Sequence, residues 1–136
     1  MISFNSLSVK FDLPEKRKIK LRIQSLVTLE NKGVGEIAFI FCSDDELLQI
    51  NQQYLKHDYY TDVITFDYSE NTDVSGDIFI SIDTVRANAK EYNQSFDEEL
   101  HRVMAHGILH LCGYKDKTST QKKTMREKED FYLSKF

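Results

Sequence analysis

The chain has 136 residues, a length typical of one domain, and 40% of them are hydrophobic, which is enough for a buried core. One proline and five glycines exclude a proline- or glycine-rich disordered chain, and no run of ~18 apolar residues is present to span a membrane. The first residues contain no apolar segment of signal-peptide length, and Cys42 and Cys112 form no CxxC pair. We therefore expect a cytoplasmic protein whose two thiols stay reduced and buried.

The formal net charge of −4 argues weakly against a nucleic-acid partner, but the charges are unevenly distributed. Residues 1–35 carry seven basic and three acidic side chains, residues 36–99 carry three basic and fifteen acidic, and residues 100–136 carry eight basic and four acidic. Both ends of the chain are thus basic around an acidic middle. The mean charge does not exclude a basic face that could bind RNA.

The first part of the chain alternates strand and helix patterns. Residues 2–10 alternate loosely, as in a strand, and a helix is expected between Pro14, which suits a first helical turn, and Gly33. The continuous apolar run 37–42 predicts a buried strand, and residues 43–44 can cap a helix after it. The inward side chains of that helix are expected to be Leu47, Ile50 and Tyr54.

Two further strands are expected at residues 63–66 and 78–82. The polar loop 69–75 between them makes an antiparallel pair the natural arrangement. Asp83 should cap a short helix that follows the second strand. The inward side chains of this helix are expected to be Val85, Ala89 and Tyr92.

The C-terminal part has the pattern of two helices. The capping box 95–98 opens the first, which continues to Gly113, a residue that commonly ends helices. Residues 118–121 cap the last helix, and its inward side chains are expected to be Met125, Tyr132 and Phe136. These elements predict an α+β fold: a single domain over residues 1–136, with an about four-stranded mixed sheet covered by helices.

A pair of histidines near the end of the long predicted helix carries the most functional information. His106 and His110 lie four residues apart, about 40° around a helix axis, so both imidazoles can reach one metal ion. Gly113 lets the chain fold back, and Asp116 could supply a third, oxygen ligand that leaves the fourth position for water. A metal held in this way acidifies its water and polarises a carbonyl or phosphoryl oxygen. The sequence thus predicts a metal site at the end of a buried central helix.

The two histidines and the aspartate are also compatible with roles other than a hydrolytic metal centre. His106 and His110 could be hydrogen-bonded polar residues of a buried helix, although a helical pair followed by a breaker and a carboxylate favours a metal. Two histidines and one carboxylate also form the facial triad of non-haem Fe(II) oxygenases, which usually have more strands than are expected here. A zincin protease is disfavoured, because Gly107 replaces the general-base glutamate of HExxH. Gly107 is better suited to the close approach of another backbone or a substrate.

Four blocks of sequence together point to one family. The segment HGILHLCGY at residues 106–114 is preceded by NQQY at 51–54, TDVITF at 61–66 and GDI at 76–78. In this order the blocks resemble the YbeY family of bacterial rRNA-maturation endoribonucleases, whose signature is HGxLHLxGYDH. The resemblance implies one Zn²⁺ per chain, cleavage of single-stranded RNA, maturation of the 3′ end of small-subunit (16S) rRNA and ribosome quality control. It also implies contact with the small ribosomal subunit and its proteins, and a ribosome-assembly GTPase is a further candidate partner.

Two positions depart from the family pattern. Asp116 stands where the family usually has a third histidine. Aspartate is a competent zinc ligand, but its negative charge should make the bound water less acidic. Leu55 stands where the family usually has an arginine that is thought to assist catalysis. Lys56 is the candidate replacement for that arginine, with His57 as a second choice.

Two basic clusters are candidate RNA contacts. Lys16, Arg17 and Lys18 lie at the start of the first predicted helix, where cations oppose the helix dipole. Lys115 and Lys117 flank the proposed third metal ligand, where they could steer a polyanion. For the first cluster, a solvated helix face is the plainer interpretation.

Asp62 and Asp77, each expected at the start of a strand, could orient site residues or cap backbone N–H groups. The leading hypothesis is a zinc-dependent, single-strand-specific endoribonuclease whose metal ligands are His106, His110 and Asp116. The alternative is a non-catalytic ribosome-assembly factor with a structural metal, which the missing arginine keeps open.

Overall fold

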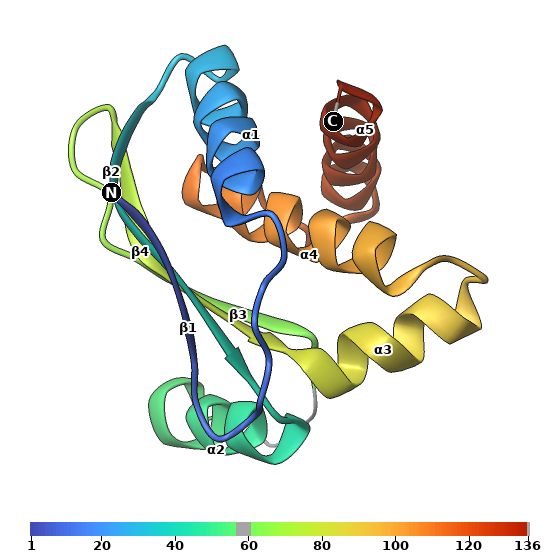
Figure 1. Cartoon of the computed structure of the whole chain (residues 1–136). Helices are drawn as coiled ribbons and strands as arrows, with labels where there is room; N and C mark the ends of the chain where they lie inside the picture. The colour runs from blue at the N-terminus through green and yellow to red at the C-terminus, as the bar shows by residue number, and fades with distance from the viewer. Residues whose placement is uncertain (57–60, 136) are drawn as a thin grey trace.

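The computed structural model describes residues 1–56 and 61–135, and it contains nine helices and strands within them (Figure 1). In chain order they are β1 (Ile2–Ser6), α1 (Lys16–Leu29), β2 (Gly33–Cys42), α2 (Asp44–Leu55), β3 (Val63–Asp67), β4 (Asp73–Ser81), α3 (Ile82–Glu91), α4 (Phe96–Leu111) and α5 (Ser119–Lys135).

The four strands form one mixed sheet in the order β1-β2-β4-β3. β1 pairs with β2 and β2 with β4 in parallel, whereas β3 pairs with β4 antiparallel. Parallel neighbours need a long connection between them, and α1 supplies it for the first pair. The antiparallel pair predicted from residues 63–66 and 78–82 is confirmed, as is the α+β fold with four mixed strands.

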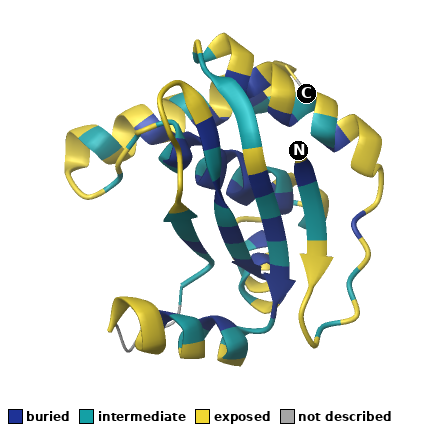
Figure 2. Ribbon diagram, turned by 90° about the vertical axis from the view of Figure 1, so that its left-hand side faces the viewer, coloured by how far each residue is buried: buried dark blue, intermediate teal, exposed yellow. Residues whose placement is uncertain are grey.

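Helices cover the two faces of the sheet unequally (Figure 1). α1 and α4 pack on one face, and α5 packs against α4 from the outside. On the opposite face, Leu47 of α2 lies with Cys42 and Ile64 in a smaller cluster. Figure 2 shows the buried residues concentrated along the middle strands of the sheet. Because nine of the sixteen residues of α4 are buried, this is the buried central helix that the sequence predicts.

The ends of α1 differ from the prediction. The helix begins at Lys16, so Pro14 lies before it instead of in its first turn, and Glu15 between them has a positive φ of 57°. The helix stops before Asn31, whose left-handed conformation (φ 61°) is one that terminates helices. Gly33 therefore begins β2 and does not end α1.

Three further boundaries were predicted wrongly. β1 stops at Ser6 instead of residue 10, and β4 begins at Asp73, inside the predicted loop. The strand ends at Ser81, whose side chain accepts a hydrogen bond from the N–H of Thr84 at 3.2 Å. Ser81 is thus the cap of α3, and Asp83 lies within the first turn of that helix.

Two tyrosines expected on inner helix faces lie at the surface: Tyr54 is 62% exposed and Tyr92 is 61% exposed. Tyr54 contacts the ring of Phe66 edge-on, at the margin of the smaller cluster. Tyr92 is the C-cap residue of α3, beyond its last buried turn. Phe136, also expected inside, lies outside the described residues.

The two cysteines are free thiols, of which Cys42 is buried and Cys112 is half-buried at the edge of the core. Burial raises the pKa of Cys42 to about 12 and that of Cys112 to about 11. Both therefore remain protonated and poorly reactive at neutral pH. The expectation of a buried thiol is confirmed for Cys42, and Cys112 is more exposed than expected.

Gly107 lets α4 lie close to the sheet, although its neighbour is a side chain and not the backbone or substrate that was expected. A Cβ at this position would lie 2.8 Å from Cγ2 of the buried Ile78 in β4. Gly107→Ala is expected to destabilise the protein by about 1–2 kcal/mol, because overpacking outweighs the gain in helix propensity. Urea unfolding measures this change.

The double variant Gly107→Ala/Ile78→Ala provides the control for that prediction. It should be more stable than the sum of the two single changes predicts, since the second change removes the clashing methyl. A Gly107→Ala protein as stable as the wild type would show that the sheet and α4 can separate without cost.

Within the described residues, none of the helices combines the length and the apolar character that crossing a membrane requires.

Candidate metal centre

The polar residues of the site lie along one face of α4. The start of this helix is set by the predicted capping box, in which Ser95 and Glu98 exchange hydrogen bonds. The polar residues that follow at intervals of three or four are Glu99, Arg102, His106 and His110. Because such intervals place side chains on one helix face, these four form a single polar stripe.

The chain turns back sharply after α4. Gly113 has a φ of 110°, a conformation that glycine adopts readily and other residues rarely do. The N–H of Tyr114 donates to the carbonyl of Leu109 at 3.1 Å and closes the turn. Asp116 is thereby returned to the end of the helix, beside the two histidines.

Three potential ligand atoms converge at this point. The Nε2 atoms of His106 and His110 are 3.0 Å apart, and Oδ2 of Asp116 lies 3.3 Å from the first and 3.5 Å from the second. Ligands held ~2.0–2.1 Å from a tetrahedral zinc ion lie about 3.3–3.4 Å from one another. The three atoms therefore fit a zinc ion, and the predicted proximity of these residues is confirmed.

The other ring nitrogen of each histidine has its own acceptor. Nδ1–H of His106 donates to Oε2 of Glu129 at 2.6 Å, and Nδ1–H of His110 donates to the backbone carbonyl of Tyr114 at 2.9 Å. With Nδ1 as the donor in both rings, each Nε2 can turn its lone pair toward a metal ion. A carboxylate or carbonyl that orients a histidine in this way is typical of metal sites.

The surroundings shift the two histidines in opposite directions. Burial favours the neutral ring, but the hydrogen bond and charge of Glu129, together with Asp62 and Asp116, raise the pKa of His106. Burial and the neighbouring His106 lower the pKa of His110, so this ring is neutral at pH 7. The site therefore provides a neutral imidazole and an imidazole paired with a carboxylate.

Glu129→Gln is expected to weaken zinc binding by about 10–100-fold, because the amide removes the negative charge that makes His106 a better ligand. Competition with a chromogenic chelator measures the affinity. Asp130→Asn is the matched control, since Asp130 contacts Arg102 and not the histidine. Equal affinities in the two variants would show that Glu129 does not orient the ligand.

A second, half-buried carboxylate supports the loop that carries Asp116. Glu30, the C-cap residue of α1, accepts a hydrogen bond from the hydroxyl of Tyr114 at 2.6 Å and another from the hydroxyl of Tyr132. Nζ of Lys128 also lies 3.1 Å from this carboxylate. We call these four residues the Glu30 cluster; it joins α1 and α5 to the turn whose carbonyl orients His110.

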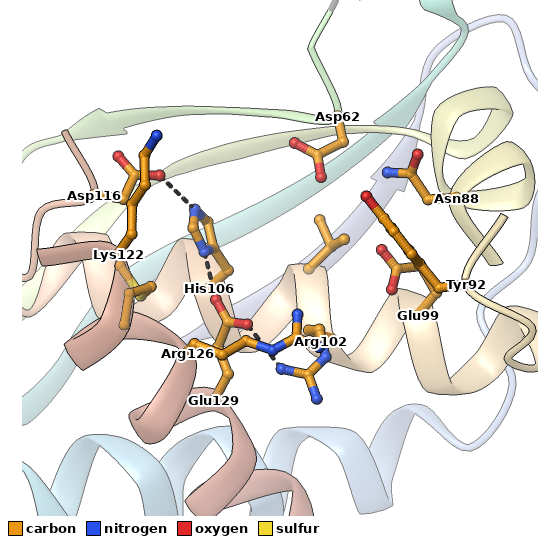
Figure 3. A pocket seen from close by; sticks show the side chains of 12 residues that line it. Asp62, Asn88, Tyr92, Glu99, Arg102, His106, Asp116, Lys122, Arg126 and Glu129 are labelled. Atoms are coloured by element: carbon orange, nitrogen blue, oxygen red, sulfur yellow. Dashed lines mark hydrogen bonds and ion pairs between the residues drawn. The ribbon is translucent and has the colours of Figure 1, made fainter. Parts of the chain in front are cut away.

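A cavity of about 300 Å³ opens beside His106 and Asp116, between α3, α4, α5 and the residue before β3 (Figure 3). It is lined by Asp62, Asn88, Tyr92, Glu99, Arg102, Val103, His106, Asp116, Lys122, Met125, Arg126 and Glu129. Asp62 faces this cavity across from His106, whereas Asp77 lies inside β4 and not at a strand start. Acidic and basic side chains thus meet around one cavity.

The other predicted site residues lie elsewhere. Lys56 is the C-cap residue of α2 and does not line the cavity, and His57 lies outside the described residues. Lys16 pairs with Asp12 at 2.6 Å, at the start of α1. Lys18 lies near His101, which is five residues before the first ligand. Burial lowers the pKa of His101 most, and the positive charge of Lys18 lowers it further. None of these lysines lines the cavity.

Lys115 and Lys117 flank Asp116 as predicted, and both are exposed. Their contact with RNA stays a prediction. Two other basic residues of the C-terminal segment, Lys122 and Arg126, line the cavity itself. The basic end of the chain therefore does share a face with the candidate metal centre, through α5.

Sequence reasoning missed Glu129, Arg102 and Glu30. Arg102 lies in α4 and donates to Glu129 at 2.9 Å and to Asp130 at 2.7 Å. A signal for Glu129 was present, because it lies four residues after Met125 and three before Tyr132, on the face of α5 expected to be apolar. A glutamate on such a face needs a partner. No local pattern marks Glu30, whose partners follow it by 84 residues or more.

Comparison with known proteins agrees with this description. The family model for endoribonuclease YbeY matches residues 4–136. An endoribonuclease YbeY from Phocaeicola vulgatus is 52% identical over 134 residues, which cover 98% of this chain and 97% of that protein. One from Flavobacterium psychrophilum is 52% identical over 136 residues, which cover 100% of this chain and 96% of that protein.

A protein from Thermotoga maritima, known from a solution structure, has a similar fold. The TM-score is 0.69 at 33% sequence identity, and the match covers 98% of this chain and 87% of that one. The resemblance seen in the four sequence blocks therefore extends over almost the whole chain and its fold. The chain belongs to the endoribonuclease YbeY family.

Proposed function

We propose that this chain is a metal-dependent endoribonuclease that cuts single-stranded RNA, with one zinc ion held by His106, His110 and Asp116. The observation that carries the proposal is the convergence of three ligand atoms whose separations fit a tetrahedral zinc ion. The relatives that match nearly the whole chain are named endoribonucleases, which supports RNA as the substrate.

An open coordination position distinguishes this proposal from a structural metal. Structural zinc sites usually have four protein ligands, whereas catalytic sites have three and leave one position for water or substrate. In the part of the chain that the structure describes, no fourth histidine, cysteine or carboxylate joins the group. Asp116 is 41% exposed on its side chain, so the group is reachable from the cavity.

The protein's own residues prepare the site for phosphodiester hydrolysis. Bound zinc supplies a polarised phosphoryl oxygen and a more acidic water. Glu129 and the carbonyl of Tyr114 hold the two imidazoles in the tautomer that binds a cation. Lys122 and Arg126 place positive charge on the cavity wall formed by α5, where the phosphates of an RNA strand can lie.

The wider role that we propose, from membership of the family, is maturation of the 3′ end of 16S rRNA and quality control of ribosomes in the cytoplasm. The small ribosomal subunit and its proteins are the proposed partners, and a ribosome-assembly GTPase is a further candidate. Lys115 and Lys117, beside Asp116, are proposed RNA contacts, and Lys56 is proposed to contact phosphate.

The test compares single-stranded RNA with a duplex of the same sequence, using protein whose zinc content is measured. We expect one zinc per chain, cleavage of the single strand, loss of cleavage with a chelator and recovery on adding zinc. Zinc-loaded protein that leaves both substrates intact but still binds small subunits would support the assembly-factor alternative. Stoichiometric iron in protein purified anaerobically would instead favour an oxygenase.

A further inference from the structure

The cavity beside the ligand atoms is larger than a metal and its water require. Its volume of about 300 Å³ lies at the lower end of the range of small-molecule pockets, ~300–1,000 Å³. His106 and Asp116 form one end of it, so whatever fills the cavity touches the group bound at the metal centre. In a nuclease this occupant is a nucleotide next to the bond that is cut.

Glu99 lies on the wall of this cavity. The residue is only 5% exposed, and within residues 1–56 and 61–135 no hydrogen bond reaches its carboxylate. Glu129, the other buried acid of the cavity, is by contrast bonded to both Arg102 and His106. Among the described residues no fully buried side-chain oxygen lacks a partner, so the carboxylate of Glu99 is open to the cavity, where a ligand that brings N–H groups can bond to it.

The charges around Glu99 are of both signs. Burial and the nearby carboxylates of Asp62 and Glu129 raise the pKa of Glu99, while the positive charges of Arg102 and Arg126 act in the opposite direction. Those two arginines would repel a second metal ion. Among the described residues, moreover, neither Glu99 nor Asp62 joins a group of three potential metal ligands.

An aromatic ring stands at the side of the same cavity. Tyr92 follows Asn88 by one helical turn, and both side chains face the space in front of Glu99 (Figure 3). Tyr92 is 61% exposed, so its ring is accessible to a ligand in the cavity. Exposed aromatic rings beside acceptors are the usual means by which proteins hold an unpaired base, by stacking and by hydrogen bonds to its edge.

We propose that this cavity binds the guanine base of the nucleotide next to the scissile phosphate, with Glu99 accepting both N–H groups of its Watson–Crick edge and Tyr92 stacking on the ring. Guanine is the base whose edge presents two adjacent donors, N1–H and the N2 amino group, which a carboxylate accepts in pairs. Adenine, cytosine and uracil each present an acceptor beside a donor. This assignment rests on the proposed ribonuclease function.

The test measures binding of three nucleotides to the zinc-loaded protein by calorimetry: GMP, IMP, which lacks the N2 amino group, and AMP. All three carry the same phosphate, so differences between them report the base. Wild-type protein should bind GMP about 5- to 150-fold more tightly than IMP or AMP. Glu99→Gln should bring the three affinities within twofold of one another, and Tyr92→Ala should weaken all three without changing their order.

Glu127→Gln is the matched control, because it removes the same charge from an exposed position outside the cavity and should leave the preference intact. Thermal unfolding of each variant checks that the fold survives. Equal binding of the three nucleotides by a folded wild-type protein overturns the guanine subsite. So does a second metal ion that binds to the wild type and is lost in Glu99→Gln, because Glu99 would then be a metal ligand.

Cleavage assays separate this proposal from the function on which it rests. RNA cleavage by the wild type without any preference for guanosine beside the cut overturns the subsite and leaves the nuclease intact. Selective GMP binding by a protein that cuts no RNA overturns the nuclease and supports the guanine subsite as a binding site. Preference for guanosine that disappears in Glu99→Gln supports both.

Discussion

His110→Ala is expected to abolish both zinc retention and RNA cleavage. The variant removes one of three ligand atoms and leaves only His106 and Asp116 to hold the ion. Loss of a residue that merely orients a ligand costs ~10–100-fold, so loss of the ligand itself should reduce zinc affinity and cleavage by more than about 100-fold. Chelator competition and single-turnover cleavage of one RNA, in the same preparation, measure both effects.

The control for this change is His101→Gln on the same helix. His101 is half-buried near Arg22 and lies away from the ligand atoms, so its loss should leave zinc content and cleavage near the wild-type level. Cleavage by metal-free His110→Ala at the wild-type rate would exclude a metal-dependent mechanism. Full zinc retention by that variant would exclude His110 as a ligand.

Arg102→Met should cause the largest loss of stability among the charged residues of the site. The Arg102 side chain is 14% exposed and pairs with Glu129, whose side chain is 7% exposed. Removing one member of a buried ion pair leaves the other charge without compensation, which costs ~3–5 kcal/mol. We expect the free energy of unfolding, from urea titration, to fall by about 3 kcal/mol.

Lys16→Met provides the comparison with a surface ion pair. Lys16 and Asp12 are 2.6 Å apart but exposed, with side-chain accessibilities of 47% and 89%, and such pairs contribute ~0.2–1 kcal/mol. The free energy of unfolding of Lys16→Met should differ from that of the wild type by about 0.5 kcal/mol or less. Similar losses in the two variants would mean that solvent screens the Arg102 pair as effectively as the surface one.

The fold could be predicted from patterns that are local in the sequence. Apolar runs and capping boxes identify most of the helices and strands, because burial and N-terminal hydrogen bonds depend on neighbouring residues. The errors lie at ends of elements, such as Asn31 and Ser81, where backbone conformation or a single side-chain bond decides the boundary. Tyr54 and Tyr92 were wrongly expected to be buried, because the helical period shows which face of a helix points inward but not how far along the helix the rest of the protein covers that face.

The ligand set of the site could be predicted for the same reason, since His106, His110 and Asp116 lie within eleven residues of one another. The residues that orient them could not. Glu129 reaches His106 across 23 residues, and Glu30 reaches Tyr114 across 84. Which helix docks beside which is a property of the packed molecule, so these contacts leave little trace in any short segment of sequence.

The Glu30 cluster has a consequence for the order of events during folding. Its bonds join residues separated by 84, 98 and 102 positions. Closing such long loops costs chain entropy, which contacts between distant residues recover only late. Tyr114, and with it the acceptor that orients His110, is therefore expected to settle after the helices have formed. In refolding experiments zinc uptake should lag behind recovery of the helical circular dichroism signal, so that the protein becomes able to bind its metal only as folding is completed.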